Sequence, residues 1–438
     1  MKIGIRREDK NEWEGRVPLI PEHVKELNQN YGIKFIIQPS NIRAFSEEEY
    51  KQAGAIIRED LSECSIILAV KEIPEDFFVQ NKVYVFSSHT IKGQKYNMPM
   101  LKRMMELKNT LIDYERIVDD KGKRLIFFGR FAGIAGMVNT FWAFGQRLEW
   151  EGYKTPFSKL KQTLNYSGLD EVKSAYKEIG EVIVKEGLLE DIVPLIVGFA
   201  GYGNVSKGAQ EIFDIFPYKE IEPKNLKDFM QKGDFSNRHL YKVVFKEEDM
   251  VRPINSSISF GLQDYYHHPE KYISRFEDYL PYLKVLVNAI YWDKMYPKLV
   301  TKKYLKTVYD AGKTLPLKVI GDISCDVEGS IECNLTTTDS GNPVYVYDPL
   351  NQIIRYGVEG DGPVILAVDN LPCELPEESS SIFSNVLKNF IPQLIEVDFS
   401  KPFEKVNIHP EIKRATILYK GELTPDYKYL LEYLNRSK

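Results

Sequence analysis

Two titratable side chains in the first hundred residues could form an acid–base pair. Lys71 ends the apolar run Ile66–Val70, and His89 follows the apolar run Val83–Phe86. A mostly apolar setting favours the neutral amine of a lysine, which can then act as a base. Histidine changes charge near neutral pH and can pass a proton to or from an amine or a carbinolamine. The structural alternatives are a solvated loop lysine and a histidine that only ties down a strand end.

A glycine-rich turn near the middle of the chain has the pattern of a dinucleotide site. The apolar run Ile192–Phe199 leads into a turn that contains Gly201 and Gly203, and a helical pattern follows. Such glycines let the backbone reverse and approach a ligand, and the helix start offers N–H groups to a pyrophosphate. Glu222 lies 19 positions after Gly203, at the end of a predicted strand, where a carboxylate could bind a ribose. The third glycine, Gly208, departs from the usual spacing, so a plain glycine turn is the alternative.

Several cations at predicted strand and loop ends would suit a substrate with more than one carboxylate. Arg16 lies on the loop after the strand predicted at Lys2–Ile5. Its planar fork could hold a carboxylate through two parallel hydrogen bonds, although most arginines are only solvated. Positive charge at further predicted strand or loop ends comes from Lys92, Lys123 and Arg124.

The composition is that of a globular protein with more than one domain. The 438 residues exceed the length at which a single core keeps growing, and 43% are hydrophobic and 28% charged. No apolar run reaches the roughly 18–20 residues that cross a bilayer. The chain begins with a strand-like segment, so we expect no membrane span and no targeting peptide. The net charge of −5 disfavours nucleic acids and anionic membranes as partners.

The cysteines and histidines give no metal-binding pattern. No C-x-x-C pair occurs, and no histidine has a spacing from a cysteine that suits zinc. We therefore expect no metal site, reduced structural thiols and a cytoplasmic location. The four cysteines are Cys64, Cys325, Cys333 and Cys373.

Strand-like runs alternate with helical patterns along most of the chain, which is typical of parallel sheets with crossover helices. In the first 130 residues the predicted strands are Lys2–Ile5, Lys34–Gln38, Ile66–Val70, Val83–Phe86 and Leu125–Phe128. Helices are predicted at Pro21–Leu27 and Met98–Leu107. Later strands are predicted at Ile192–Phe199, Tyr218–Glu222, Tyr241–Phe245, Val285–Asn288, Lys318–Asp322 and Val364–Val368. The pattern predicts an α/β protein with two doubly wound, Rossmann-like domains.

Two long helices are expected to connect these domains. Helical patterns run over Ala132–Trp150 and from about Glu377 to Val397. If the second helix crosses back, residues 372–438 complete the domain that residues 1–133 begin, and residues 134–371 form the other domain. We therefore expect a discontinuous substrate-binding and catalytic domain, a dinucleotide-binding domain, and a cleft between them.

Longer stretches of the sequence resemble the lysine–ketoglutarate reductase portion of the α-aminoadipic semialdehyde synthase family. They cover essentially the whole chain: residues 6–9, 37–41, 88–92, 112–115, 203–209, 268–276, 322–324 and 369–372. More widely, the chain is similar to lysine-forming saccharopine dehydrogenase and alanine dehydrogenase, which share the two-domain arrangement. The resemblance implies reversible reductive condensation of L-lysine with 2-oxoglutarate to saccharopine, with NAD(P)H as the cofactor.

The matching positions also imply residue roles. Lys71 and His89 match the family's acid–base pair, and Glu115 matches an acidic neighbour that tunes the lysine. The positions that match substrate contacts are Arg16, Gln94, Arg124, Phe128 and Asn370. The positions that match dinucleotide contacts are Gly201, Tyr202, Gly203, Glu222, Asp322, Ser324 and Asp326.

The choice of nucleotide stays open at this level. A carboxylate at Glu222 would repel a 2′-phosphate and so favours NAD. The animal relatives are associated with NADPH, and Lys219 and Lys224 lie close to Glu222 in sequence. The resemblance therefore gives a slight preference for NADPH.

Other functions and partners also stay open. One alternative is reductive amination of a different keto acid, as in alanine dehydrogenase, and another is a non-catalytic dinucleotide-binding sensor. The bifunctional family members continue into a saccharopine-cleaving half, whereas this sequence ends at Lys438. A separate saccharopine-cleaving enzyme is therefore one expected partner, and a homo-oligomer is another.

Overall fold

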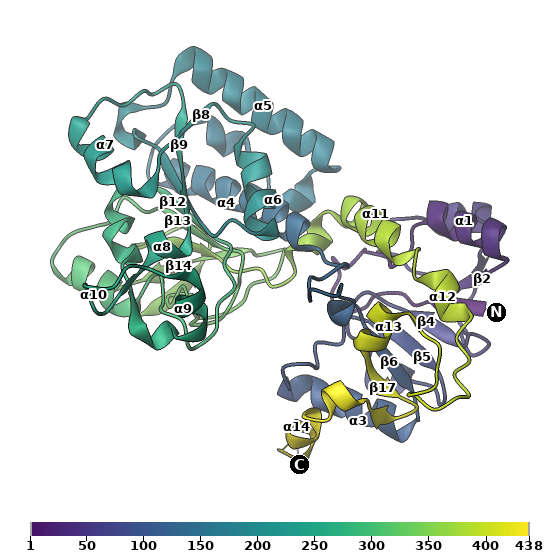
Figure 1. Cartoon of the computed structure of the whole chain (residues 1–438). Coiled ribbons are helices and arrows are strands. Elements are labelled where there is room, and N and C mark those ends of the chain that lie inside the picture. The colour runs from purple at the N-terminus through teal and green to yellow at the C-terminus, as the bar shows by residue number, and fades with distance from the viewer. Residues whose placement is uncertain (1, 437–438) are drawn as a thin grey trace. The chain divides into compact units, whose positions relative to one another are not determined.

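The computed structural model describes residues 2–436, and the chain divides into two compact units (Figure 1). Unit 1 is Met1–Phe128 with Pro376–Lys438, and unit 2 is Gly129–Leu375. The divisions fall at 128/129 and 375/376, a few residues from the expected 133/134 and 371/372. The reason is that α4 (Gly129–Trp150) lies in unit 2 over its whole length.

Unit 1 is built on an eight-stranded sheet with the order β18-β17-β6-β5-β4-β1-β2-β3. The strands from β1 to β6 pair in parallel, whereas β17 runs antiparallel to β6 and β18 antiparallel to β17. The strands are β1 (Lys2–Ile5), β2 (Lys34–Ile37), β3 (Ile56–Ile57), β4 (Ile66–Leu68), β5 (Val83–Phe86), β6 (Thr110–Asp113), β17 (Thr416–Tyr419) and β18 (Glu422–Leu423). The helices are α1 (Pro21–Tyr31), α2 (Glu47–Gln52), α3 (Met98–Glu106), α11 (Pro376–Leu387), α12 (Ile391–Ile395), α13 (Pro410–Ala415) and α14 (Leu430–Arg436).

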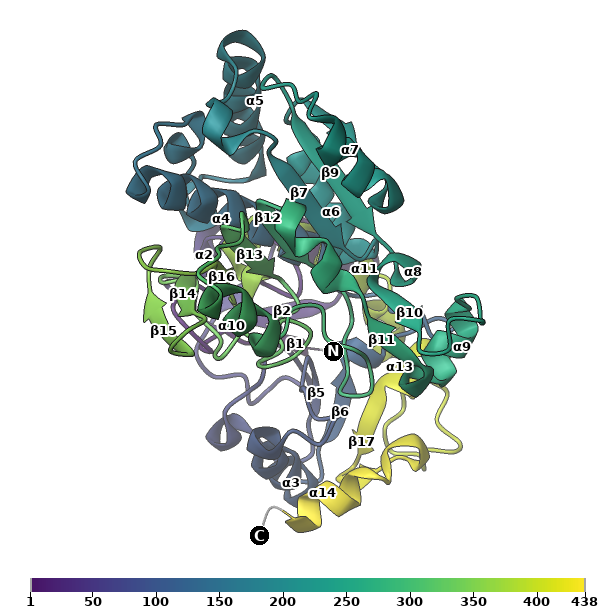
Figure 2. The same cartoon turned by 90° about the vertical axis from the view of Figure 1, so that its left-hand side faces the viewer.

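Unit 2 has its own eight-stranded sheet, with the order β15-β14-β16-β13-β12-β7-β9-β8 (Figure 2). Only β14 and β15 break the parallel pattern. The strands are β7 (Ile196–Ala200), β8 (Tyr218–Glu220), β9 (Leu240–Phe245), β12 (Val285–Asn288), β13 (Val319–Asp322), β14 (Val344–Asp348), β15 (Ile353–Tyr356) and β16 (Val364–Leu366), and a separate antiparallel pair is formed by β10 (Val251–Pro253) and β11 (Tyr272–Ser274). Besides α4, the helices are α5 (Leu169–Glu186), α6 (Asn204–Phe213), α7 (Leu226–Lys232), α8 (Glu247–Met250), α9 (Leu262–His267) and α10 (Lys302–Asp310).

The prediction of two mainly parallel α/β sheets is confirmed, with two local corrections. Leu125–Phe128 forms no strand, and the strand that follows α3 is β6 instead. The helix expected over Glu377–Val397 is divided, because α11 ends at Leu387 and a separate short helix, α12, carries Pro392 near its start. Proline lacks the amide hydrogen that a continuing helix needs, and its ring clashes with the preceding turn.

The helices α4 and α6 pack closely because two glycines face the partner backbone. A Cβ atom added at Gly133 would lie 1.9 Å from the carbonyl oxygen of Val205, and one added at Gly208 would lie 2.0 Å from that of Arg130. Gly208 therefore serves helix packing, which explains a third glycine outside the spacing expected for phosphate binding. Over residues 2–436, no helix combines the length and apolar character needed to span a bilayer.

Candidate functional site

Lys71, Glu72 and His89 lie at adjacent strand ends in unit 1, and we call them the lysine–histidine group. Lys71 and Glu72 follow β4, and His89 follows β5. The two strands pair in parallel, so their carboxyl ends lie at the same edge of the sheet. Oε1 of Glu72 lies 2.5 Å from Nδ1 of His89. The sequence-predicted base and acid are thus brought to one edge, with a carboxylate that sequence reasoning did not single out.

The electrostatic setting of Lys71 favours a neutral amine. Burial lowers the pKa of Lys71, and the charges of Arg16 and Lys10 lower it further. Glu72 and Glu14 oppose this shift. A lysine with a lowered pKa can accept a proton at lower pH than a solvated one.

The carboxylate of Glu72 is held in its ionised form. Burial alone would raise its pKa, but the hydrogen bond and charge of His89, followed by the charges of Lys10 and Lys71, bring the pKa to about 2. Because an ionised carboxylate can only accept, the proton of this hydrogen bond belongs to Nδ1 of His89. The other ring nitrogen, Nε2, is then the one that can exchange a proton with a substrate.

Glu8 fixes the backbone from which Lys71 extends. Its two carboxylate oxygens accept hydrogen bonds from the amides of Val70 and Lys71, at 2.7 and 2.9 Å. Burial and the nearby charge of Glu14 raise the pKa of Glu8 to about 7, although the two amide hydrogen bonds act in the opposite direction. Glu8 lies in one of the stretches that resemble the family, residues 6–9, but its role was not predicted because it depends on the pairing of β1 with β4.

Arg16 is buried and already engaged with a carboxylate of its own chain. Its Nε and Nη2 atoms donate to the two carboxylate oxygens of Glu14, at 2.7 and 2.5 Å. The guanidinium carbon lies 4.3 Å from the centre of the Phe128 ring, which in turn stacks on Phe383. The expected two-bond carboxylate clamp is therefore made with Glu14, and Phe128 is the platform for the arginine.

Glu115 and Arg124 form an ion pair with each other. Arg124 also donates through Nε to the main-chain oxygen of Glu115, at 3.0 Å. The acidic side chains that oppose the lowered pKa of Lys71 most strongly are Glu72 and Glu14, and the role of Glu115 as a neighbour of Lys71 stays a prediction.

Gln94 and the loop after His89 are held by hydrogen bonds between residues close in sequence. Oε1 of Gln94 accepts from the amide of Lys92 at 3.2 Å, and the Asn97 side chain donates to the main-chain oxygen of His89 at 3.2 Å. Lys123 is exposed, on the turn that begins at Asp119. These contacts hold the loop that carries His89.

In unit 2 the glycine turn has the geometry expected of a phosphate-binding loop. Gly201 has a φ of +94°, a conformation that other residues rarely adopt. Gly203 precedes α6, and apart from Gly203 and its two chain neighbours no described atom lies within 4 Å of the position that a Cβ atom would take there. The start of α6 thus faces open space, where its free N–H groups could bind a phosphate.

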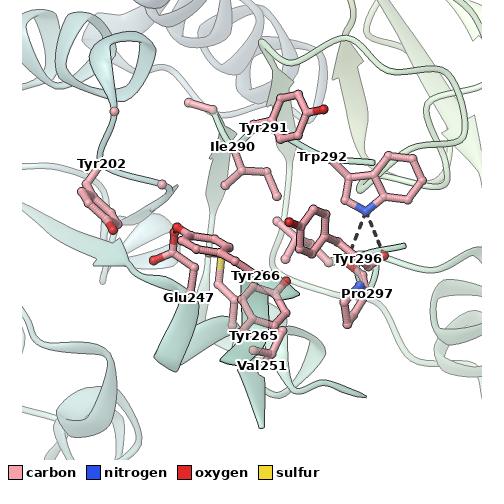
Figure 3. A pocket seen from close by; sticks show the side chains of 15 residues that line it. Tyr202, Glu247, Val251, Tyr265, Tyr266, Ile290, Tyr291, Trp292, Tyr296 and Pro297 are labelled. Atoms are coloured by element: carbon pink, nitrogen blue, oxygen red, sulfur yellow. Dashed lines mark hydrogen bonds between the residues drawn. The ribbon is translucent and has the colours of Figure 1, made fainter. Parts of the chain in front are cut away.

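A pocket of about 420 Å³ adjoins this turn, and we call it the tyrosine pocket (Figure 3). The Tyr266 hydroxyl donates to Oε1 of Glu247 at 2.7 Å, and Tyr202 lines the same pocket. Burial, and next the charge of Glu247, raise the pKa of Tyr202. The lining is completed by Gly201, Gly203, Met250, Val251, Tyr265, Leu299 and residues 289–292 and 296–297.

Glu222 does not line the tyrosine pocket. It lies two residues beyond β8, its side chain is 65% exposed, and it pairs with Lys224 at 3.0 Å. In the sheet, β9 lies between β8 and β7, so the strand end beside the glycine turn is that of β9. The carboxylate that the structure places at the turn is Glu247, shortly after β9.

The predicted Asp322–Asp326 turn contacts residues that line the tyrosine pocket but does not line it itself. Asp322 is only 1% exposed, and it accepts from Asn288 and Asn334 at 2.7 and 2.8 Å. Burial raises its pKa to about 6. Ser324 donates to the main-chain oxygen of Ile290, a pocket residue, at 2.6 Å. Asp322 and Ser324 therefore hold the loop that follows β12 and lines the pocket.

Two further predicted residues belong to unit 2. Asp326 is exposed in the loop after Asp322, and its main-chain oxygen accepts from Gly329 at 2.9 Å. Asn370 is buried at the start of a 3₁₀ turn, Leu371–Glu374. Among the described residues, no group of three or more His, Cys, Asp or Glu side chains is arranged to hold a metal ion.

The sequence matches two profiles of one protein family. Residues 4–135 match "Alanine dehydrogenase/PNT, N-terminal domain", and residues 264–426 match "Alanine dehydrogenase/PNT, C-terminal domain". A solved structure of L-alanine dehydrogenase superposes with a TM-score of 0.62 and 17% identity, over 99% of this chain and 100% of that one. That similarity is one of fold.

Two curated relatives are similar over most of this chain. Mitochondrial alpha-aminoadipic semialdehyde synthase from Bos taurus is 39% identical over 442 residues, which cover 98% of this chain but 47% of that protein. The chain thus spans about half the length of this relative. Saccharopine dehydrogenase (NAD(+), L-lysine-forming) from Emericella nidulans is 25% identical over 414 residues, which cover 90% of this chain and 92% of that protein.

Proposed function

This chain belongs to the alanine dehydrogenase/PNT family, and on that premise we propose that it is an oxidoreductase that reversibly condenses L-lysine and 2-oxoglutarate into saccharopine. The lysine–histidine group carries the proposal. It offers a base with a lowered pKa beside a carboxylate-bound imidazole at one sheet edge. Condensation of an amine with a ketone needs both a base and an acid, because a proton leaves the amine and water leaves the adduct.

Each proton transfer has a residue suited to it. Lys71 takes a proton from the ε-amine of the substrate, which then adds to the keto carbon of 2-oxoglutarate to form a carbinolamine. His89 protonates the hydroxyl group of this adduct, and water leaves to give an imine. Glu72 holds the His89 ring so that Nε2 carries out this exchange.

Reduction of the imine requires a hydride, which a reduced nicotinamide supplies when bound. We assign its dinucleotide to the glycine turn at Gly201 and Gly203 and to the tyrosine pocket. The open space before α6 suits the pyrophosphate. We propose that Asp326 and Asn370 lie near the nicotinamide and the substrate.

The substrate carboxylates need cations at the unit 1 edge. Arg124 is partly exposed and pairs with Glu115, so an incoming carboxylate could share its guanidinium. Arg16 is buried with Glu14 and contributes its positive charge rather than a free fork. We keep Gln94 and Phe128 as substrate-side residues, the second through its contact with Arg16.

The test is to follow oxidation of reduced nicotinamide with lysine plus 2-oxoglutarate, and in parallel with ammonia plus pyruvate. The proposal expects oxidation with the first pair only, and formation of saccharopine. Oxidation with ammonia and pyruvate alone would replace it by an alanine-dehydrogenase-like reaction. Dinucleotide binding without oxidation, across both pairs, would favour a sensor.

Partners and location remain proposals. A homo-oligomer and a separate saccharopine-cleaving enzyme fit the proposed reaction. Among the described residues, the four cysteines are free thiols, as in a reducing compartment. A cytoplasmic location stays a prediction, because the relative from Bos taurus is described as mitochondrial.

A further inference from the structure

The tyrosine pocket contains a carboxylate where a dinucleotide would place its adenosine ribose. Strand order decides this position. β9 lies directly beside β7, pairing Ala200 with Phe245, so the two strands end together. The glycine turn follows β7, and Glu247 follows β9. In dinucleotide-binding α/β folds, the ribose lies at this pair of strand ends.

The carboxylate of Glu247 is held in place by a hydroxyl group. Tyr266 donates to its Oε1 atom at 2.7 Å. Tyr202 of the glycine turn lies close enough that the charge of Glu247 adds to burial in raising the pKa of Tyr202. The three side chains come from the glycine turn, α8 and α9, and they meet at one end of the pocket (Figure 3). A ribose diol that entered here would find a fixed hydrogen-bond acceptor.

The charge of the pocket lining has one sign. Among residues 2–436, those that line the pocket include the carboxylate of Glu247 and no lysine, arginine or histidine. The chain continues past Glu247 with two more acids, Glu248 and Asp249. Lys246 precedes it but is exposed and outside the lining. A 2′-phosphate at this point would face a negative charge without an arginine or lysine to bind it.

We infer that Glu247 makes this pocket selective for the dinucleotide with a free 2′-hydroxyl, NADH, over the 2′-phosphorylated NADPH. The inference rests on the proposed function in assigning the pocket to a dinucleotide. Like charges brought together at a binding interface cost several kcal/mol, so NADH should bind roughly 100-fold more tightly than NADPH. It reverses the slight preference for NADPH that the family resemblance gave, and it assigns the ribose carboxylate to Glu247 instead of Glu222.

The experiment is a titration of the full chain with NADH and NADPH, without substrates. Trp292 lines the pocket and donates to the main-chain oxygen of Tyr296, so its fluorescence can report occupation. Calorimetry gives the two dissociation constants independently. The inference expects tight binding of NADH and a dissociation constant for NADPH that is larger by roughly 100-fold.

Variants test whether Glu247 is the cause. Glu247→Gln removes the charge at constant size, so NADPH should gain affinity and the ratio of the two constants should fall by roughly tenfold or more. Glu248→Gln removes a charge from the exposed neighbour outside the lining, so the ratio should change much less than in Glu247→Gln. Glu247→Arg should favour NADPH. Unfolding curves establish that each variant is folded. The ratio of the two dissociation constants of the wild-type chain tests the inference even if a variant does not fold.

The outcomes separate this inference from the proposed function. Equal or tighter binding of NADPH to the wild-type chain overturns the inference, as does a ratio that Glu247→Gln leaves unchanged. In both cases oxidation with lysine and 2-oxoglutarate could still proceed, and the proposed function would stand. A chain that binds neither nucleotide would instead overturn the assignment of the pocket on which both depend.

Discussion

Oε1 of Glu72 lies 2.5 Å from Nδ1 of His89, although the two residues are 17 positions apart in sequence. His89 has a φ of +48°, a backbone conformation that a residue with a side chain rarely adopts. If no residue bonded to it, the imidazole ring of a histidine at a strand end could rotate freely. The hydrogen bond instead fixes its tautomer and leaves Nε2 for proton exchange.

Glu72→Gln should lower turnover while the fold remains. Without the carboxylate, Nδ1 of His89 loses the acceptor that fixes its tautomer, so Nε2 is no longer held for proton exchange. We expect turnover to drop by about 10–100-fold, within the range that one acid–base residue contributes. Turnover at saturating substrate measures this change. Glu75→Gln, at an exposed acid nearby, is the control, and equal effects of the two changes would contradict the role of Glu72.

The same carboxylate should make stability depend on pH. The folded-state pKa of Glu72 is about 2, below its unfolded value near 4.5. Its contribution is therefore fully present above about pH 4.5 and is lost as the pH falls toward 2. Glu72→Gln should unfold about 2 kcal/mol more easily at pH 7 and lose part of the acid dependence between pH 4.5 and 2. Parallel unfolding curves of the two proteins at pH 7 and pH 3 should differ less at the lower pH.

Lys71→Met should remove activity without destabilising the protein. Burial lowers the pKa of Lys71, so the folded state binds a proton less readily than the unfolded chain, and wild-type stability rises with pH over the interval between the two values. Methionine removes the cost of burying an ionisable amine, so the melting temperature at pH 7 should stay equal or rise. Turnover should fall by about 100-fold or more. Lys95→Met, at an exposed lysine, should leave both unchanged, and full activity in Lys71→Met would exclude Lys71 as the base.

Glu8 should weaken the fold as the pH rises. Its folded-state pKa is raised to about 7 from 4.5, so the folded chain holds a proton that the unfolded chain releases between these values. The contribution of Glu8 is therefore present below about pH 4.5 and is lost as the pH rises toward 7. Glu8→Gln cannot ionise, so the difference in unfolding free energy between wild type and variant should shift in favour of the variant from pH 5 to pH 8. A difference that is constant across this interval would contradict the raised pKa.

Much of the fold could be predicted because its strands are short, continuous apolar runs. β1, β5 and β12 match their predicted ranges to the residue, since buried parallel strands need apolar side chains on both faces. The same rule failed at Leu125–Phe128, where an apolar run packs against the core as a loop. Composition alone does not distinguish these two uses of an apolar segment.

The candidate site could be predicted where its residues follow the ends of two strands that pair directly. Lys71 and His89 follow strand ends, and parallel pairing brings such ends together. Glu222 has the correct distance from the glycine turn along the chain, but β9 takes the place beside β7, and Glu247 comes with it. Glu8 holds the amides of Val70 and Lys71, and Glu14 binds the buried side chain of Arg16. Neither contact could be read from the sequence. Strand order is a property of the whole sheet, so no local spacing contains it.

Two glycines of the turn and helix should respond in opposite ways to the same added methyl group. Gly208→Ala would place Cβ 2.0 Å from the carbonyl oxygen of Arg130, so α4 and α6 must separate, at a cost of about 1–3 kcal/mol. At Gly203 no described atom beyond its two chain neighbours lies within 4 Å of the added Cβ, and φ is −75°, so Gly203→Ala should fold like the wild type.

The methyl group of Gly203→Ala would instead occupy the space in front of α6 that we assign to the pyrophosphate. Dinucleotide affinity should therefore fall by roughly tenfold or more while the unfolding curve is unchanged. Denaturant unfolding and dinucleotide titration of both variants measure the two effects separately. If Gly203→Ala bound dinucleotide normally, the turn would be a structural feature only, and the cofactor would have to lie elsewhere.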